Sequence, residues 1–485
     1  MPEVGSRHVQ ILIVGAGPAG LVAAITLARY GVRVLLVEKR DEIAGLSRAL
    51  VISTRGMEIL RSWGLEEEVR AGAAEVEPLG WVTRTLASGE GKEVPLGYPT
   101  STEALAVSPT RPAWAPQDHL EPRLLAYLRG FASVEVRFGC ELVGLEHSRD
   151  RVRARVRDRH RGQSWEVESL FVIGADGAHS TVREQVGIRM DGPDGLGDYE
   201  RVEFRAPLAE IAGDRRYGLT IITHSDAAGV LAPRGPKDRW GFSRESKPGQ
   251  IRLVDATEEH LIQLIATAVG VPGLQPHLER SSSFTFAAQI AEQYRDGTVF
   301  LVGDAAHRMT PRGGTGMNTA IQDAYDLGWK IGWVVRGWAR TDLLDSYQTE
   351  RRPVGMHNVS RSADPDGARR DAVDALPWDL SGRLAHRWVP RGSETLSTLD
   401  LLGHGLTVLA GPEKPGWIEA TESLETRAPV AAHIVDQPVA DSLGIPRGGA
   451  LLLRPDGRQV LQWTGLDAPH HNPPLPREFG RQELV

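Results

Sequence analysis

Cysteine is nearly absent from this sequence, because Cys140 is the single one among 485 residues. One thiol cannot form an intramolecular disulfide. A chain without disulfides is typical of a reducing compartment, so we expect a cytoplasmic protein.

An excess of charge of one sign is absent as well. The formal net charge is −7, which is mild for this length and argues against a nucleic-acid partner. One basic stretch, residues 151–161, breaks this balance locally, but its arginines alternate with Val152, Ala154 and Val156. Alternation with a period of two predicts a hairpin whose charged face lies in solvent.

No apolar run is suited to crossing a membrane. Residues 11–28 are uncharged and largely apolar, but three glycines and Pro18 would break a spanning helix, and no cleavage site of a secretory signal follows. Metal-ligand clusters and Ser-His-Asp sets are missing too. We therefore expect a soluble enzyme of two or three domains, with no membrane partner and no metal.

The sequence does contain a glycine loop between a predicted strand, residues 10–14, and a predicted helix that ends at Gly31. This order is that of a dinucleotide site. Gly15 permits the tight turn, Gly17 lets the backbone approach a pyrophosphate, and Gly20 lets helix and strand pack closely, while the helix N-terminus offers N–H groups to the anion. The predicted contacts of this loop also include Pro18 and Ala19.

An acidic residue follows at the distance that such a site requires. Glu38 ends the second predicted strand, about 20 residues after the glycines, where these folds place the carboxylate that accepts both ribose hydroxyls of an adenosine. A carboxylate at this position argues against a bound 2′-phosphate. Lys39, the next residue, completes the contacts predicted at this end of the cofactor.

Three motifs in a fixed order carry a family resemblance. They are the first loop with Glu38, GADGAHSTVR at residues 174–183 and GDAAHRMTPRGGTGMN at residues 303–318. Together they resemble the class A flavoprotein aromatic hydroxylases, which bind FAD in the fold of para-hydroxybenzoate hydroxylase. Residues 313–330 are most similar to bacterial hydroxylases of phenols and aromatic polyketides in antibiotic biosynthesis.

The resemblance implies an α/β fold with three parts. Residues 1–75, 111–189 and 287–365 are expected to form a discontinuous, Rossmann-like FAD-binding domain, and residues 76–110 and 190–286 a mainly β substrate-binding lobe. Residues 375–463 resemble a short thioredoxin-like appendage, which lacks a Cys-x-x-Cys pair and so cannot carry out dithiol chemistry. A polar linker or mobile loop is predicted from Ser360 to Asp371 and a flexible tail over residues 464–485, where His470 and His471 form a chance pair rather than a metal site.

The third motif has physical roles that can be assigned to its residues. Asp304, after Gly303, can accept hydrogen bonds from the ribityl hydroxyls. A stiff segment with few side chains can lie flat against the isoalloxazine ring; it comprises Pro311, Gly313, Gly314 and Gly316. The amides of Gly316, Met317 and Asn318, at the start of a predicted helix, can stabilise negative charge on the reduced ring. Asn318 also has the simpler interpretation of an N-cap. His307 is predicted to be a hydrogen-bonded structural histidine, with no general-base partner beside it.

Further cofactor contacts are carried over from the resemblance. It implies that Gln117 contacts the ribityl chain and that Arg48 lies near the ring and the pyrophosphate. Asp176 and Arg183 are expected to help bind the pyrophosphates of FAD and NAD(P)H, with a loop-capping aspartate and a surface arginine as the alternative. Leu142 lies on the strand whose backbone would meet the adenine.

The implied reaction is the hydroxylation of a phenolic or polycyclic, polyketide-type substrate through a flavin hydroperoxide, with NADPH or NADH and O2. Alternatives are Baeyer–Villiger insertion, epoxidation and a flavin-binding protein without oxygenase turnover. Arg312 is predicted to face either the ring and an anionic substrate or the solvent. Trp240 and Phe242 could stack on the substrate, but their alternating neighbours favour a place in the core of a sheet. The sequence leaves monomer and homo-oligomer equally open.

Overall fold

The computed structural model describes residues 7–45, 48–148, 150–413, 416–465 and 475–479. Its centre is a six-stranded sheet of order β18-β19-β10-β2-β3-β6, parallel except for the edge strand β18. Its strands are β2 (Ile11–Val14), β3 (Val34–Val37), β6 (Val134–Arg137), β10 (Phe171–Gly174), β18 (Arg295–Asp296) and β19 (Val299–Leu301). The strands β2, β3, β10 and β19 are buried throughout, which is the pattern of a parallel sheet covered on both faces. The predicted Rossmann-like fold is therefore confirmed.

Two helices pack against each other through glycine. Helix α1 (Pro18–Arg29) follows β2, and α9 (Gly316–Val335) lies along it. A side chain at Gly328 would come within 2.7 Å of Thr26, and one at Gly332 within 2.8 Å of the Tyr30 ring. The two helices can approach closely because Gly328 and Gly332 have no side chain. This contact holds the two glycine motifs, which are far apart in sequence, in one region.

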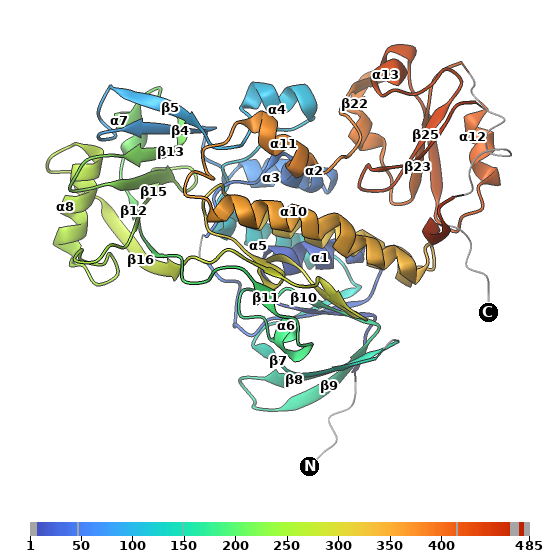
Figure 1. The fold of residues 1–485 in the computed structure, drawn as a ribbon, viewed down its shortest axis with the longest axis horizontal. Coiled ribbons are helices and arrows are strands. Elements are labelled where there is room, and N and C mark those ends of the chain that lie inside the picture. Colours follow the sequence, from blue (N-terminus) through green and yellow to red (C-terminus); the bar gives the residue numbers. More distant parts are fainter. Residues whose placement is uncertain (1–6, 46–47, 149, 414–415, 466–474, 480–485) are drawn as a thin grey trace.

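A long helix, α10 (Asp345–Ala363), crosses the middle of the molecule (Figure 1). The sequence predicted a polar linker from Ser360, and this is wrong as far as Ala363. Arg361 and Ser362 are both buried there. Spacing alone could not reveal this, because the acceptors of Arg361, the carbonyls of Leu96 and Gly367, lie outside the helix. The shorter helices of this region are α2 (Thr54–Ser62), α3 (Glu66–Arg70), α4 (Ser101–Val107), α5 (Gln117–Leu128), α6 (Thr181–Gln185) and α11 (Ala372–Leu380).

A seven-stranded sheet forms the lobe on the left of Figure 1. Its order is β16 (His277–Thr285), β12 (Asp198–Arg205), β15 (Arg239–Glu245), β14 (Gly229–Pro233), β13 (Tyr217–Ile222), β4 (Glu77–Thr83) and β5 (Gly91–Pro95). Helices α7 (Leu208–Ala212) and α8 (Glu258–Val269) contribute to the same core. Trp240 and Phe242 are buried in that core with Phe204, so the interpretation of both as sheet core holds.

Two smaller sheets border the central one. The first has the order β1 (Arg7–His8), β9 (Ser164–Ser169), β8 (Val152–Asp158) and β7 (Cys140–His147). Along β8, the arginines are exposed while Val152, Ala154 and Val156 are buried, which confirms the predicted hairpin with a solvated basic face. The second sheet contains β11 (Met190–Asp191), β17 (Gln289–Ala291) and β20 (His307–Arg308).

The C-terminal unit lies on the right of Figure 1 and has its own four-stranded sheet. The order is β24 (Val430–Ile434), β23 (Leu406–Ala410), β25 (Ala450–Leu453) and β26 (Gln459–Trp463), with a hairpin β21 (Trp388–Arg391) and β22 (Glu394–Ser397) beside it. Helices α12 (Trp417–Ala420) and α13 (Gln437–Ser442) complete the unit. Residues 455–457 form the hairpin turn between β25 and β26, in which Gly457 has φ +86°.

Part of the C-terminal tail differs from the flexible segment that the sequence predicted. Arg477–Phe479 forms a short 3-10 helix, and Phe479 is buried against Trp333 of α9. An aromatic side chain that finds an apolar partner on a distant helix is fixed by burial, a contact that local polarity does not reveal. The pair His470 and His471 lies outside the described residues.

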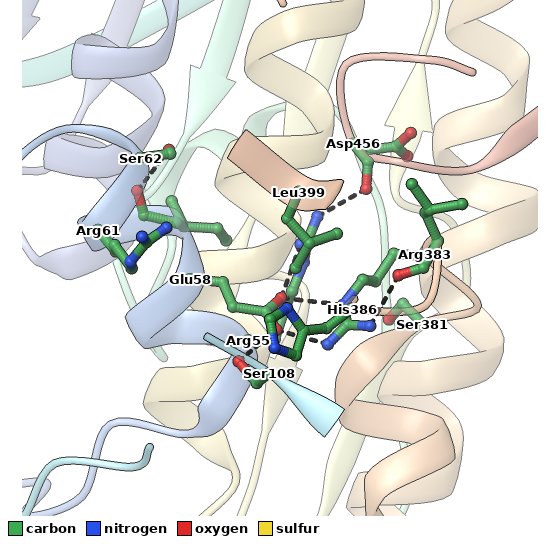
Figure 2. A network of polar contacts seen from close by, with 12 residues as sticks. Arg55, Glu58, Arg61, Ser62, Ser108, Ser381, Arg383, His386, Leu399 and Asp456 are labelled. Carbon is green, nitrogen blue, oxygen red and sulfur yellow. Dashed lines mark hydrogen bonds and ion pairs between the residues drawn. The ribbon is translucent and has the colours of Figure 1, made fainter. Parts of the chain in front are cut away.

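A buried ionic network fastens the C-terminal unit to α2 (Figure 2). Glu58 accepts hydrogen bonds from Arg55, Arg383 and Ser108, and Arg55 also donates to the carbonyl of Asp456 at 2.8 Å. Burial would raise the pKa of Glu58, but the two guanidinium groups hold it below its usual value. Since α2 begins at Thr54, this network joins the C-terminal turn to the first residues of the helix.

A second buried network joins α9, α10 and the same turn. Asp326, Glu350 and Asp456 come close enough to resemble a metal site. Their charges are met by cations instead, because Lys330 lies 2.7 Å from Asp326 and 3.0 Å from Glu350, and Arg454 binds Glu350 with two nitrogens at 2.7 and 2.8 Å. The arrangement is that of an ion-pair network rather than a ligand set for a cation.

Candidate functional site

The first glycine loop has the geometry that its sequence predicted. Gly15 has φ +106°, and a side chain there would lie 2.3 Å from the carbonyl oxygen of Ala175. A side chain at Gly20 would lie 1.9 Å from the carbonyl oxygen of Gly15. At Gly17, by contrast, a Cβ would meet nothing within 4 Å. The surface before Pro18 at the start of α1 is thus open where a pyrophosphate would lie, and the helix amides face it.

Glu38 lies directly after β3 and is buried beside this loop. Its carboxylate oxygens accept hydrogen bonds from the amides of Ala16 at 2.8 Å and Arg40 at 2.9 Å. Lys39 is exposed, and its carbonyl accepts a hydrogen bond from Arg159. The amide of Cys140 donates to the Glu38 carbonyl, so β7 runs next to this end of the site. Leu142 on β7 has its side chain in the core, which leaves only its backbone for a ligand.

The third motif meets the first one in space. Gly303, with φ +61°, lies between Ala19 of α1 and Ala320 of α9, and a Cβ there would be 3.1 Å from each methyl group. Asp304 follows in a short 3-10 helix and is exposed. The carboxylate is thereby presented at the junction of the two helix N-termini, where the middle of a long cofactor would pass.

The segment that would support the flavin ring is a tight turn with an anchor that the sequence did not reveal. The amide of Gly314 donates to the carbonyl of Pro311 at 3.0 Å, and Gly314 has φ +65°. The hydroxyl of Tyr98 donates to the Gly314 carbonyl at 2.9 Å. Tyr98 belongs to the first stretch that the sequence assigned to the substrate lobe, so only the fold brings it to this turn.

Asn318 is not an N-cap, because α9 begins at Gly316 and Thr315 precedes it. The Asn318 side chain accepts a hydrogen bond from the amide of Ser53 and donates to the carbonyl of Val51 and to Tyr98. It therefore ties the start of α9 to the segment before α2. The amides of Gly316 and Met317 in the first turn have no helical acceptor and remain available to an anionic ring edge.

The middle motif is a structural link between the other two loops. Asp176 accepts hydrogen bonds from the Ser180 hydroxyl and the Val182 amide, so it caps α6, and burial raises the pKa of Asp176. Arg183 donates to the carbonyls of Ala305 and Ala178. The alternative of a surface arginine is wrong, because Arg183 is 7% exposed and spans from α6 to the third motif.

Comparisons with known proteins agree with this arrangement. Residues 8–362 match the family model of the FAD binding domain. The chain is 34% identical to the tetracenomycin A2 monooxygenase-dioxygenase of Streptomyces glaucescens, over 94% of this chain and 93% of that protein. It is 33% identical to the aklavinone 12-hydroxylase RdmE of Streptomyces purpurascens, over 95% and 96% of the two chains. The chain belongs to the FAD-binding family of flavoprotein aromatic monooxygenases.

Solved structures of this family share the whole fold. A ternary complex of aklavinone-11 hydroxylase with FAD and aklavinone has a TM-score of 0.85 and 30% identity, covering 95% of this chain and 96% of that one. A complex of the flavin-dependent monooxygenase PieE with FAD and substrate also has a TM-score of 0.85, with 26% identity and coverage of 96% and 98%. The family, the fold class and FAD as cofactor, all indicated by the motifs, are confirmed. In the part of the monooxygenase that the structure describes, no helix has the length and apolar character needed to cross a membrane.

Gln117 of the monooxygenase is joined to an acid that the sequence reasoning missed. Gln117 is the first residue of α5, and its side chain donates to Glu121 at 2.7 Å. Burial raises the pKa of Glu121 to about 7, and the second oxygen of its carboxylate has no partner among the described residues. Arg48 is exposed and lies close enough for its charge to act on Glu121. The signal for Glu121 was its place one helical turn after Gln117.

His307 has an acidic neighbour, contrary to the prediction. Its Nε2 lies 2.7 Å from a carboxylate oxygen of Asp323, and Arg351 donates to the other oxygen at 2.8 Å. The three side chains are buried. Arg351 and His307 together hold the pKa of Asp323 below its usual value despite burial. The triad links the third motif to α9 and α10 from inside the core, which agrees with the structural role that the sequence favoured.

Arg312 points toward the seven-stranded sheet. Its guanidinium lies 5.7 Å from the centre of the Phe286 ring, and Phe286 stacks on Tyr199 with ring centres 5.1 Å apart. Burial raises the pKa of Tyr199 to about 12, so its hydroxyl stays protonated at neutral pH. No carboxylate within the described residues pairs with Arg312. The side chain therefore places a positive charge beside a largely buried aromatic pair, in which Phe286 is 3% exposed, within the turn that would support the flavin.

Proposed function

We propose that this monooxygenase hydroxylates a planar phenolic or polycyclic aromatic substrate of the polyketide type, with NADPH or NADH as reductant and O2 as oxidant. The observation that supports this most is the Arg312 guanidinium at the flavin turn, which no carboxylate among the described residues offsets and which lies beside the Phe286 and Tyr199 rings. A guanidinium suits a flat ring system with an acidic hydroxyl, because it can stack on the ring and pair with the phenolate. Relatives whose names specify tetracenomycin A2 and aklavinone support the same substrate class.

The same proposal assigns the cofactor contacts. FAD would lie along the loop at Gly15, Gly17 and the first residues of α1, with Glu38 at its ribose. Its ribityl chain would pass Asp304, Gln117 and Arg48, and its ring would lie against Pro311, Gly314 and the amides of residues 316–318. Bound FAD supplies the oxygen-transfer chemistry, and the chain's part is to orient the phenol and to exclude water.

Three further assignments belong to this proposal. Residues 76–110 and 190–286 would supply the wall of the substrate pocket, and residues 375–463 would be a thioredoxin-like unit with a packing role. The buried, unpaired Cys140 fits a cytoplasmic enzyme.

The proposal is tested by NAD(P)H oxidation in the FAD-loaded protein, with a panel of monocyclic phenols and polycyclic phenols. We expect polycyclic phenols to accelerate oxidation and to gain the mass of one oxygen atom. A product with more than one added oxygen would favour the monooxygenase-dioxygenase chemistry named for one relative. Acceleration without oxygenated product would show ligand binding without transfer, and no response to any phenol would contradict the proposal.

Removal of the Arg312 charge should affect the substrate and leave the flavin in place. In Arg312→Ala we expect the dissociation constant of an acidic polycyclic phenol to rise about 10- to 100-fold, the range of a hydrogen bond to a charged group. FAD affinity should stay within about twofold. Arg312→Lys keeps the charge but loses the planar guanidinium, so its dissociation constant for the phenol should lie between those of the wild type and Arg312→Ala. Phenol titrations followed through flavin absorbance check this, and an unchanged constant in Arg312→Ala would remove Arg312 from the substrate site.

A further inference from the structure

Arg361, in the last turn of α10, is a buried guanidinium without a carboxylate partner among the described residues. It is 8% exposed, and it donates to the carbonyls of Gly367 at 2.8 Å and Leu96 at 3.2 Å. Burial and the nearby charge of Arg370 lower the pKa of Arg361, and Tyr98 acts in the opposite direction, with no carboxylate among the groups that shift it. Arg351, on the same helix, differs in this respect because it pairs with Asp323.

The guanidinium of Arg361 lies directly against the backbone of the flavin turn. A Cβ on Gly313 would come within 3.0 Å of the Arg361 Nε, and one on Gly97 within 2.1 Å of an Arg361 Nη. Both glycines have positive φ, +83° and +76°. Arg361 also lines a pocket together with Tyr98 and Asn318, the two side chains that anchor this turn. The guanidinium is thus enclosed between two loops, and each loop faces it with a glycine, which has no side chain to displace it.

A buried positive charge is costly unless something offsets it. The two carbonyls and the C-terminal end of α10 offset part of the charge of Arg361. The group that gains negative charge at this turn is the flavin, since uptake of two electrons and one proton leaves it with one negative charge. We propose that Arg361 is a positioning residue of the flavin turn whose charge, acting through Gly313, favours the reduced, anionic form of bound FAD over the oxidised form.

The rival interpretation is that Arg361 is a structural staple, which means a side chain that only holds the two loops together through its hydrogen bonds. A staple would stabilise the turn equally for both redox forms, so its loss would weaken FAD binding or folding without changing the midpoint potential. An electrostatic role changes the ratio of the two affinities, which is what the potential measures. The proposal needs only bound FAD and does not depend on the substrate.

The test is the two-electron midpoint potential of the FAD-loaded protein, measured anaerobically by slow enzymatic reduction with a reference dye. For Arg361→Met we expect reduced FAD to bind at least tenfold more weakly relative to oxidised FAD, which is a fall of about 30 mV for a two-electron couple. Arg361→Lys should restore most of the wild-type potential. Arg352→Met is the matched control, because Arg352 lies on the same helix and donates to the carbonyl of Ala291, away from the turn, and it should leave the potential unchanged.

If Arg361→Met does not fold, Arg361→Gln serves in its place, because its amide can still donate to one carbonyl while carrying no charge. The expected result is the same fall in potential. A wild-type potential in either neutral variant, with weaker binding of oxidised FAD or a lower melting temperature, would overturn the proposal and leave Arg361 a structural staple. An equal fall in Arg352→Met would also overturn it, since the effect would then come from net charge.

Discussion

Alanine at Gly17 and alanine at Gly20 should have opposite consequences, although the residues belong to one loop. Gly17→Ala should lower the affinity for FAD at least about tenfold and leave the stability of the FAD-free protein within about 0.5 kcal/mol. Gly17 has φ −75° and ψ −177°, which alanine adopts freely, and its Cβ would meet no protein atom. The added methyl group would instead occupy the space that a pyrophosphate needs.

Gly20→Ala should destabilise the FAD-free protein itself, by about 3 kcal/mol or more, the upper range for an overpacked core. The methyl group would lie 1.9 Å from the carbonyl oxygen of Gly15, and both atoms belong to the buried contact between α1 and β2. Urea unfolding of the FAD-free proteins and FAD titration followed by fluorescence separate the two effects. If Gly17→Ala kept wild-type FAD affinity, the pyrophosphate would not lie at this loop.

Removal of Arg454 should be the most damaging single change in the C-terminal unit. In Arg454→Met, Glu350 and Asp456 lose the guanidinium that binds both, and Lys330 and Arg458 are left to offset three carboxylates. Breaking a buried ion pair by removing one partner costs about 3–5 kcal/mol. Urea unfolding at pH 7 checks this value. Arg447→Met is the control, because Arg447 is 78% exposed and pairs with Glu413 on the surface, where the loss should stay under about 1 kcal/mol.

The loss of stability in Arg454→Met should become smaller as the pH falls. Burial alone would raise the pKa of Glu350, but the hydrogen bonds from Arg454 and the charge of Lys330 lower it to about 2. A carboxylate with a depressed pKa in the folded state stabilises the protein above its unfolded pKa, near 4.5, and this contribution disappears as the pH falls through about 2. The difference between wild type and variant should thus be largest above pH ~5. A constant difference from pH 7 to pH 3 would show that lost packing, not charge, causes the effect.

Sequence reasoning located the cofactor loops because their demands are local. A tight turn at Gly15 and a close contact at Gly20 follow from spacing and flanking periodicity, and Glu38 follows from the length of one strand–helix–strand unit. The same holds for the hairpin with Val152 and Val156 buried, since alternation with period two is a property of a single segment.

What the sequence could not reveal were partners brought together by topology. Tyr98 reaches Gly314 from another lobe, and Asp323 meets His307 from a different helix. Arg361 was placed in a polar linker because its neighbours are polar, yet its acceptors, at Leu96 and Gly367, lie outside the helix. A polar group can be buried when it finds an acceptor elsewhere in the fold, and the composition of its own segment does not indicate such an acceptor.

The position of Gly303 between Ala19 and Ala320 has a consequence for the order in which the chain is made. Helix α1 is synthesised early, but the strand that precedes Gly303 and the helix that covers α1 come from beyond residue 298. Until Val335 has left the ribosome, the face of α1 that packs against α9 has no partner and the site for FAD is incomplete. Nascent chains of this monooxygenase must therefore keep their first helix out of wrong contacts for most of translation, and FAD can stabilise the fold only near its end.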